Sequence, residues 1–230
     1  MRQIIFLLLI SSIASGQSLG RYPFARAHPS GAVGWTNLVG HWSLIGNDLT
    51  DHEGSDDMSA TNAVNSADTA YYFDGNGDYL SFTGTVNTEC TFMIEVYPLN
   101  TGSKDIFGSS GGAGAIELVA YLTTLRLRVI IGGGSGTSMA DLALTANEWN
   151  WVSIAVSDAG NTVKYGVDGS YETETDWTET TIFQTNRVGS FSGANDFYGY
   201  IRNVWKFSDI KAESYTTAME GRDYADGDPE

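Results

Sequence analysis

Residues 161–169, Asn-Thr-Val-Lys-Tyr-Gly-Val-Asp-Gly, constrain the fold of this chain more than any other stretch. Val163, Tyr165 and Val167 alternate with polar or small residues, which is the period-two pattern of a strand that is buried on one face. The Asp-Gly pair at 168–169 is a strong hairpin signal, because a type I′ turn needs positive φ at both central residues. The sequence therefore predicts an antiparallel hairpin at this point.

Short segments with a similar pattern recur along the chain. They lie at residues 38–44, 70–73, 79–82, 91–97, 105–108, 116–121, 125–131, 139–144, 149–157, 171–175, 187–191 and 197–207, and one short helix is expected at 211–219. Short, regularly spaced strands with almost no helical periodicity are typical of sandwiches and jelly rolls. The sequence predicts an all-β fold, a two-sheet antiparallel β-sandwich, in which the glycine-rich segment 74–78 joins its flanking strands as a hairpin.

The predicted core is rich in aromatic and β-branched side chains. Cys90 is the single cysteine, so it cannot form an intrachain disulfide, and we expect it to be a small buried hydrophobe. A chain of 230 residues can bury enough apolar surface for stability as one domain. The residues expected to be mostly buried are Trp149, Trp151, Val152, Ile154, Tyr165, Val167 and Ile201, with Trp42 and Trp205 on other strands.

The N-terminus has the features of a secretory signal peptide. A positively charged start, a continuous apolar run at 4–10 and a small-residue cleavage site at 14–16 follow one another. The run is much shorter than the roughly 20 residues of a membrane-spanning helix. We therefore expect a secreted protein without a transmembrane segment, with a signal peptide at 1–16, a linker or arm at 17–34, one β-sandwich at 35–219 and an acidic tail at 220–230.

The charge of the chain restricts its partners. The formal net charge is −16, from 28 acidic and 12 basic residues. Binding of nucleic acid needs clusters of Lys and Arg against the phosphates, so nucleic acid is not an expected partner. An acidic surface fits a soluble extracellular protein.

Six segments in order carry a resemblance to a known family. They are residues 38–44 (LVGHWSL), 72–80 (YFDGNGDYL), 91–98 (TFMIEVYP), 147–156 (NEWNWVSIAV), 163–169 (VKYGVDG) and 198–207 (YGYIRNVWKF). Together they resemble the laminin-G-like jelly rolls of the concanavalin A-like lectin and glucanase superfamily, over roughly residues 35–219. The resemblance implies a module that binds carbohydrate or protein. Its motifs belong to turns and core, and they bring no catalytic residue with them.

A sugar site would need flat aromatic faces for stacking and polar groups for hydrogen bonding. Candidates on expected loops are Trp177, Tyr171, Asn195, Asp196 and Tyr198. These five are our predicted ligand-binding residues.

A catalytic alternative rests on Glu174, Asp176 and Glu179. Some glycoside hydrolases of the same superfamily carry Glu-x-Asp-x-x-Glu on one strand, and a retaining enzyme needs two carboxylates about 5 Å apart. Alternation places Glu174 and Asp176 on one face, whereas Glu179 joins them only through a β-bulge. The surrounding run is rich in Thr and Glu, which also fits a solvated acidic segment.

Asp74, Asn76 and Asp78 have the spacing that opens a calcium loop. Thr85 stands where an EF-hand has its bidentate Glu, so calcium is a candidate cofactor without an EF-hand, and an ordinary turn is the alternative. The expected function is a secreted, non-catalytic module that binds a glycan or a surface protein. The alternatives are a glycoside hydrolase, and a structural or adhesive component of a larger assembly such as a cell surface or a phage virion.

Overall fold

The computed structural model describes residues 37–66, 70–87, 89–99, 104–108, 119–120, 142–157, 162–174, 183–190, 196–213 and 215–216. Within these ranges the regular elements are strands. They are β1 (Leu38–Trp42), β2 (Ser59–Thr61), β3 (Val64–Ser66), β4 (Ala70–Asp74), β5 (Tyr79–Asn87), β6 (Glu89–Pro98), β7 (Lys104–Asp105), β8 (Phe107–Gly108), β9 (Val119–Ala120), β10 (Asn150–Ser157), β11 (Thr162–Val167), β12 (Ser170–Glu174), β13 (Phe183–Val188) and β14 (Tyr198–Phe207). The predicted signal peptide, arm and acidic tail lie outside the described residues.

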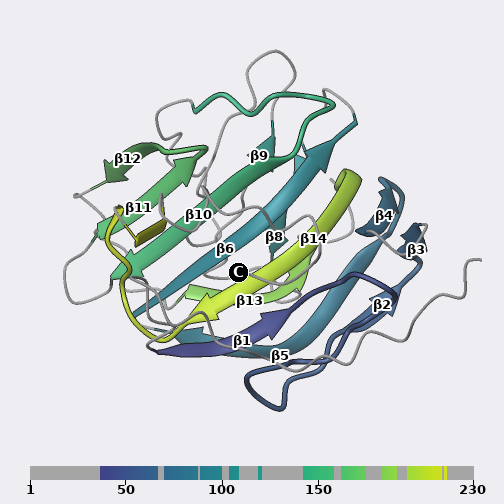
Figure 1. Cartoon of the computed structure of the whole chain (residues 1–230), viewed down its shortest axis with the longest axis horizontal. Helices are drawn as coiled ribbons and strands as arrows, with labels where there is room; N and C mark the ends of the chain where they lie inside the picture. Colours follow the sequence, from purple (N-terminus) through teal and green to yellow (C-terminus); the bar gives the residue numbers. More distant parts are fainter. Residues whose placement is uncertain are drawn as a thin grey trace, which may run out of the picture.

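Two antiparallel sheets make up the body of the described structure. The larger sheet has the order β12-β11-β10-β6-β14-β4-β3, and β1 also pairs with β14. The smaller sheet has the order β2-β5-β13-β8. A separate two-stranded sheet is formed by β7 and β9. Figure 1 views the larger sheet face on, with β8 and β13 behind β6 and β14. The predicted all-β sandwich is confirmed.

The predicted hairpin at 168–169 is confirmed. β11 pairs with β12 from Val163 opposite Glu174 to Val167 opposite Ser170. Asp168 and Gly169 have φ of 46° and 78°, as a turn of this kind requires. Asp168 Oδ1 also accepts a hydrogen bond of 2.8 Å from the Trp151 backbone N–H, which ties the turn to β10.

The second predicted hairpin is wrong. β4 pairs with β14 and β3 in the larger sheet, whereas β5 pairs with β13 and β2 in the smaller one. The segment between them, residues 75–78, therefore carries the chain from one sheet to the other. Its glycines have positive φ as expected, but the turn redirects the chain across the sandwich.

The main core lies between the sheets. Alternate residues of the larger sheet point into it, and the smaller sheet contributes Leu80, Phe107 and Val188. The predicted core residues Val152, Ile154, Tyr165, Val167, Ile201 and Trp42 are buried there, as is Cys90.

A second apolar cluster lies on the outer face of the larger sheet. It consists of Met93, Trp151, Trp205 and Phe207, with the Trp151 and Trp205 rings stacked at 5.0 Å between centroids. Trp151 and Trp205 are therefore buried as expected, but outside the main core.

The prediction that Trp149 is mostly buried in the core is wrong. It is only half-buried and lies just before β10. It has the same alternation as Trp151, so it points away from the main core. Its neighbours are Tyr97 and Arg202 on the outer face.

The predicted helix at 211–219 is seen only in part. Thr216 donates a backbone hydrogen bond to the Ala212 carbonyl, which makes a single helical turn. A search of the described residues found no helix with the length and apolarity needed to cross a membrane.

Candidate functional site

Five aromatic side chains form a row across the outer face of the larger sheet. Each of them is half-buried. On β14, Tyr198 and Tyr200 alternate with the buried Gly199 and Ile201, so both rings face away from the core. The aromatic row, as we call it, consists of Tyr198, Tyr72, Tyr200, Tyr97 and Trp149.

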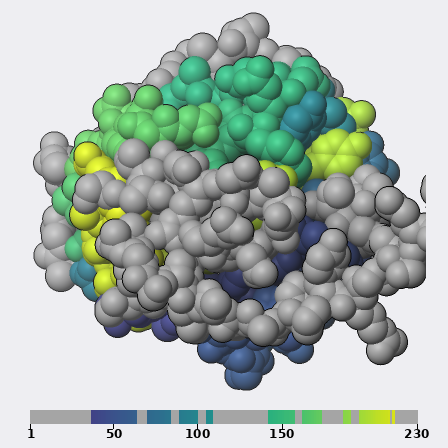
Figure 2. Space-filling view, in the orientation of Figure 1, coloured from purple at the N-terminus to yellow at the C-terminus, as the bar shows by residue number. Residues whose placement is uncertain are grey.

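Each ring in the row contacts its neighbour. Tyr72 lies 6.2 Å from Tyr198 and 5.2 Å from Tyr200, between ring centroids. Tyr97 lies 5.9 Å from Tyr200 and 5.5 Å from Trp149. The planes of these pairs are inclined by 44° to 74°, so neighbouring rings in the row meet at steep angles. In Figure 2, yellow-green atoms of β14 reach the surface toward the upper right, beside blue and teal atoms of earlier strands.

A buried ion pair lies beside the row, on the same face of the larger sheet. The Arg202 guanidinium lies over the Trp149 ring at 4.2 Å from its centroid. Its Nε and Nη2 donate to Glu95 Oε2 and Oε1 at 3.1 Å and 3.0 Å, and Asn203 Nδ2 donates to Glu95 Oε2 at 2.6 Å. Glu95 is 2 % exposed, so three donors hold a carboxylate that is almost removed from water.

The Tyr72 phenol, near one end of the row, has a raised pKa. A hydrogen bond with Tyr198 is the main reason that the pKa of Tyr72 rises to about 12, and burial and the Asp74 carboxylate add to the rise. Tyr72 therefore keeps its proton at physiological pH. The row combines apolar ring faces with the hydroxyl groups of four tyrosines, which is the composition of a stacking site for a polar ring.

Of the five predicted ligand-binding residues, only Tyr198 lies in the row. Trp177 and Asn195 lie outside the described residues. Tyr171 lies on β12, at the opposite edge of the larger sheet from β4. The structure thus does not bring the described candidates together, and the ligand-binding roles of all five stay predictions.

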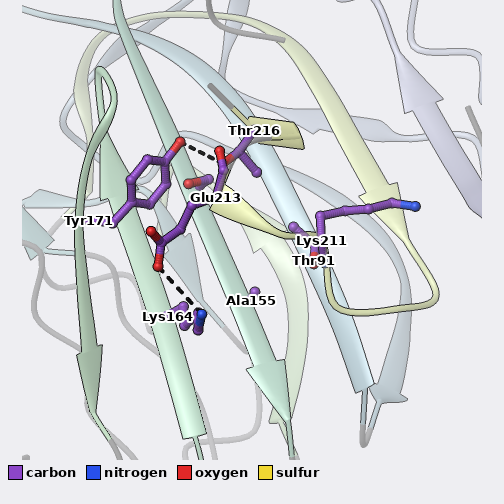
Figure 3. Close-up of a pocket in the computed structure, with 8 residues that line it drawn as sticks. Thr91, Ala155, Lys164, Tyr171, Lys211, Glu213 and Thr216 are labelled. Carbon is purple, nitrogen blue, oxygen red and sulfur yellow. Dashed lines mark hydrogen bonds and ion pairs between the residues drawn. The ribbon is translucent and has the colours of Figure 1, made fainter. Parts of the chain in front are cut away.

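Tyr171 packs against the C-terminal segment. Its hydroxyl lies 2.5 Å from Thr216 Oγ1, and nearby Lys164 Nζ lies 3.4 Å from Glu213 Oε1 (Figure 3). A Cβ at Gly166 would lie 2.3 Å from the Tyr171 ring, so glycine lets this ring lie flat over β11. The small pocket drawn in Figure 3 is therefore lined in part by groups that hold Lys211, Glu213 and Thr216 on the sheet.

Asp196 belongs to the crossover between the sheets. It is 4 % exposed, and its Oδ2 accepts a hydrogen bond of 2.5 Å from the Gly77 backbone N–H. Asp78 accepts from the Asp74 backbone N–H, and Asp74 Oδ1 accepts from Asn76 N–H at 2.8 Å. The loop is thus organised by its own carboxylates.

Burial is the main cause of a raised pKa at Asp78, and the carboxylates of Asp74 and Asp196 raise it further, against the hydrogen bond from the Asp74 N–H. Among the described residues, no group of three or more acidic, histidine or cysteine side chains is arranged to hold a metal ion. Calcium binding by Asp74, Asn76 and Asp78 stays a prediction.

The catalytic candidates fall at the end of the described chain segment. Glu174 is the last residue of β12, where its backbone pairs with Val163. Asp176 and Glu179 lie outside the described residues. Their catalytic role stays a prediction.

Four members of the row are not among the ligand-binding residues predicted from the sequence. Tyr72, Tyr97 and Tyr200 lie within predicted strands, and Trp149 is a predicted core residue. Alternation carried a usable signal, because Tyr200 has the same parity as Tyr198 and the opposite parity to Ile201. The sequence contains no signal for the pairing of β14 with β4 and β6, since these strands are distant in sequence.

No family model and no curated protein sequence matches the chain. Solved structures do match it. Domain 4 of AbnA, a GH43 extracellular arabinanase from Geobacillus stearothermophilus solved with arabinotriose, is similar with a TM-score of 0.58 and 20% identity, over 79% of this chain and 97% of that domain.

Two larger proteins contain a similar unit. Trypanosoma rangeli sialidase in complex with sialic acid has a TM-score of 0.65 and 17% identity over 83% of this chain, which spans 33% of the sialidase. The ligand-binding domain of botulinum neurotoxin serotype D in complex with N-acetylneuraminic acid has a TM-score of 0.61 and 13% identity, over 84% of this chain and 54% of that chain. At such identities the likeness concerns the fold alone, and it shows that this chain is a β-sandwich.

Proposed function

We propose that this protein is a non-catalytic carbohydrate-binding module of the laminin-G-like type, and that the aromatic row is its binding surface. The observation that carries the proposal is the row itself: five half-buried rings on four neighbouring segments of one sheet face. Large aromatic rings left half-exposed in a line supply the apolar faces on which sugar rings stack. The four tyrosines of the row also carry hydroxyl groups beside these faces.

The solved relatives support the class of ligand. Three similar structures were determined with a bound sugar: arabinotriose, sialic acid and N-acetylneuraminic acid. Their sugars are properties of those proteins, and they make carbohydrate the first ligand class to test here.

The chemistry beside the row favours binding over cleavage. A glycosidase of the usual kind needs two carboxyl groups free to exchange protons or attack the sugar. Glu95, the buried carboxylate next to the row, is held by Arg202 and Asn203 and is 2 % exposed. Such a carboxylate is engaged in holding Arg202 against the Trp149 ring.

Affinity electrophoresis through gels with embedded polysaccharides tests the proposal. Tyr200→Ala and Trp149→Ala should each weaken retention about 3- to 10-fold, because each removes a stacked ring whose contribution is about 1 kcal/mol. Tyr79→Ala is the matched control, since Tyr79 is a half-buried tyrosine on the smaller sheet, beneath Arg187 and away from the row. It should leave retention unchanged.

Retention that both row variants leave intact would contradict the proposed site. Release of reducing sugar that Glu174→Gln or Glu179→Gln abolishes would instead favour the glycoside hydrolase alternative. We also propose that the protein is secreted, from the signal-peptide pattern at 1–16. A protein that binds no glycan in the whole panel would fit a structural role in a larger assembly.

A further inference from the structure

The cation of the aromatic row is already neutralised. Arg202 gives its Nε and Nη2 hydrogens to both oxygens of Glu95, at 3.1 Å and 3.0 Å. Acidic sugars are commonly held by a guanidinium that faces the ligand carboxylate with two parallel hydrogen bonds. In this protein the Nε edge of the guanidinium is occupied by a buried carboxylate, and one face is covered by Trp149.

Exposed acidic residues stand at both ends of the row. Asp74 lies opposite Tyr198 in the pairing of β4 with β14, and its side chain is exposed. Its charge reaches the row, because it contributes to the raised pKa of Tyr72. Glu148, also exposed, precedes Trp149 at the other end. With a chain net charge of −16, these carboxylates would repel an anionic ligand on approach and at contact.

The row is longer than one sugar ring. It runs from β4 across β14 and β6 to the residue before β10, which is three strand spacings of about 4.8 Å, or about 14 Å in all. Neighbouring ring centroids lie 5.2 Å to 6.2 Å apart along it. A single sugar would cover only part of such a surface, whereas a chain of sugars laid across the strands would cover all of it.

We infer that the aromatic row binds a chain of uncharged sugars and excludes chains of acidic sugars. This inference rests on the proposed function and narrows it to one ligand class. It also separates this protein from the two sialic-acid complexes among its structural relatives, and leaves it closer in ligand chemistry to the arabinotriose complex.

The test compares retention on neutral polymers (arabinan, xylan, mixed-linkage glucan and mannan) with retention on polysialic acid and polygalacturonate. We expect retention by at least one neutral polymer and by neither acidic one. Retention should stay constant between about 20 mM and 500 mM salt, a range over which the Debye length falls from about 20 Å to about 4 Å. A trisaccharide of the retained polymer should compete at least 10-fold better than its monosaccharide.

Reversing the charge of one acidic residue at the end of the row tests the repulsion of acidic sugars directly. Glu148→Lys should leave neutral retention within about twofold and should raise retention of polysialic acid at low salt by about 3- to 10-fold. Glu172→Lys is its control, because Glu172 is also exposed and its reversal changes the net charge equally, but it lies on β12, at the far edge of the sheet. An equal gain in polysialic acid retention from both variants would contradict the idea that acidic residues next to the row repel acidic sugars.

The outcomes separate the two proposals. Retention by an acidic polymer that Tyr200→Ala abolishes would overturn this inference and leave the carbohydrate-binding function intact. Equal competition by monosaccharide and trisaccharide would overturn the chain-binding part. Retention by no polymer at all, or retention that Tyr200→Ala leaves unchanged, would overturn the proposed function itself.

Discussion

Trp149 and Trp151 show that strand parity outweighs hydrophobicity in deciding where a tryptophan goes. Both have the parity of Ser153, whereas Val152 and Ile154 point into the main core. Their size argued for the core, and their position in the alternation argued for the outer face. Trp151 is 8 % exposed because Trp205 stacks on it, while Trp149 joins the aromatic row.

Stability measurements can separate these two kinds of tryptophan. Trp205→Ala should lower the free energy of unfolding by about 3–5 kcal/mol, because Trp205 is fully buried between Trp151 and His41. Trp149→Ala should lower it by only about 1 kcal/mol, since that ring is partly exposed to water and lies outside the main core. Urea melts of the two variants measure the difference. Equal losses of unfolding free energy in the two variants would indicate that Trp149 is packed as a core residue.

At the scale of elements, local turn chemistry and strand pairing were predictable to different extents. The Asp-Gly pair at 168–169 carried enough information to predict the β11–β12 hairpin. The Asp-Gly-Asn-Gly-Asp segment carried similar turn residues and led to a wrong hairpin between β4 and β5. Turn residues specify where the chain bends, but the partner of β4 is β14, which the chain reaches only much later.

Long-range polar contacts explain why this segment crosses between the sheets. Asp196 accepts from the Gly77 N–H, and Asn62 Nδ2 donates to the Gly77 carbonyl at 3.2 Å. Both partners come from outside the segment, so neither could be read from its own residues. Asp196 was proposed from the sequence as a ligand-binding residue, and its observed contact is with this crossover.

The crossover should make stability depend on pH. The folded pKa of Asp78 is raised above 3.8, mainly by burial, so the folded state holds this proton more tightly than the unfolded chain does. The stabilisation from the proton is complete below the unfolded pKa and is lost as pH rises through the folded pKa. Asp78→Asn should therefore lose less stability than the wild type between about pH 4 and pH 7. Urea melts across that range test this expectation, and parallel pH profiles would contradict it.

At the scale of the whole molecule, the sandwich was predictable and the candidate site was not. Alternation and turn signals recur along the chain, so many separate segments indicate the fold class. The aromatic row depends on five residues, and these become neighbours only when distant strands pair in the larger sheet. Trp177, Asn195, Asp176 and Glu179 lie outside the described residues, so their predicted roles are still to be tested.

The excess of acidic residues should make the folded state sensitive to salt. With 28 acidic and 12 basic residues, compaction brings like charges together, and screening relieves their repulsion. Raising sodium chloride from about 10 mM to 500 mM should raise Tm by about 2–4 °C for each kcal/mol of repulsion removed. Choline chloride is the control for specific cation binding and should give the same shift. A fall in Tm would mean that ion pairs such as Arg202 with Glu95 outweigh the repulsion.

The strand order of the larger sheet gives a ligand on the aromatic row an additional effect. Tyr72, Tyr97, Trp149 and Tyr200 come from regions of the chain that are far apart in sequence, and they become neighbours through the order β10-β6-β14-β4. A sugar chain lying on all of them would act as a removable cross-link between those regions. It would stabilise the middle of the sheet from its outer face, and its release would loosen neighbouring strands that are not consecutive in the chain.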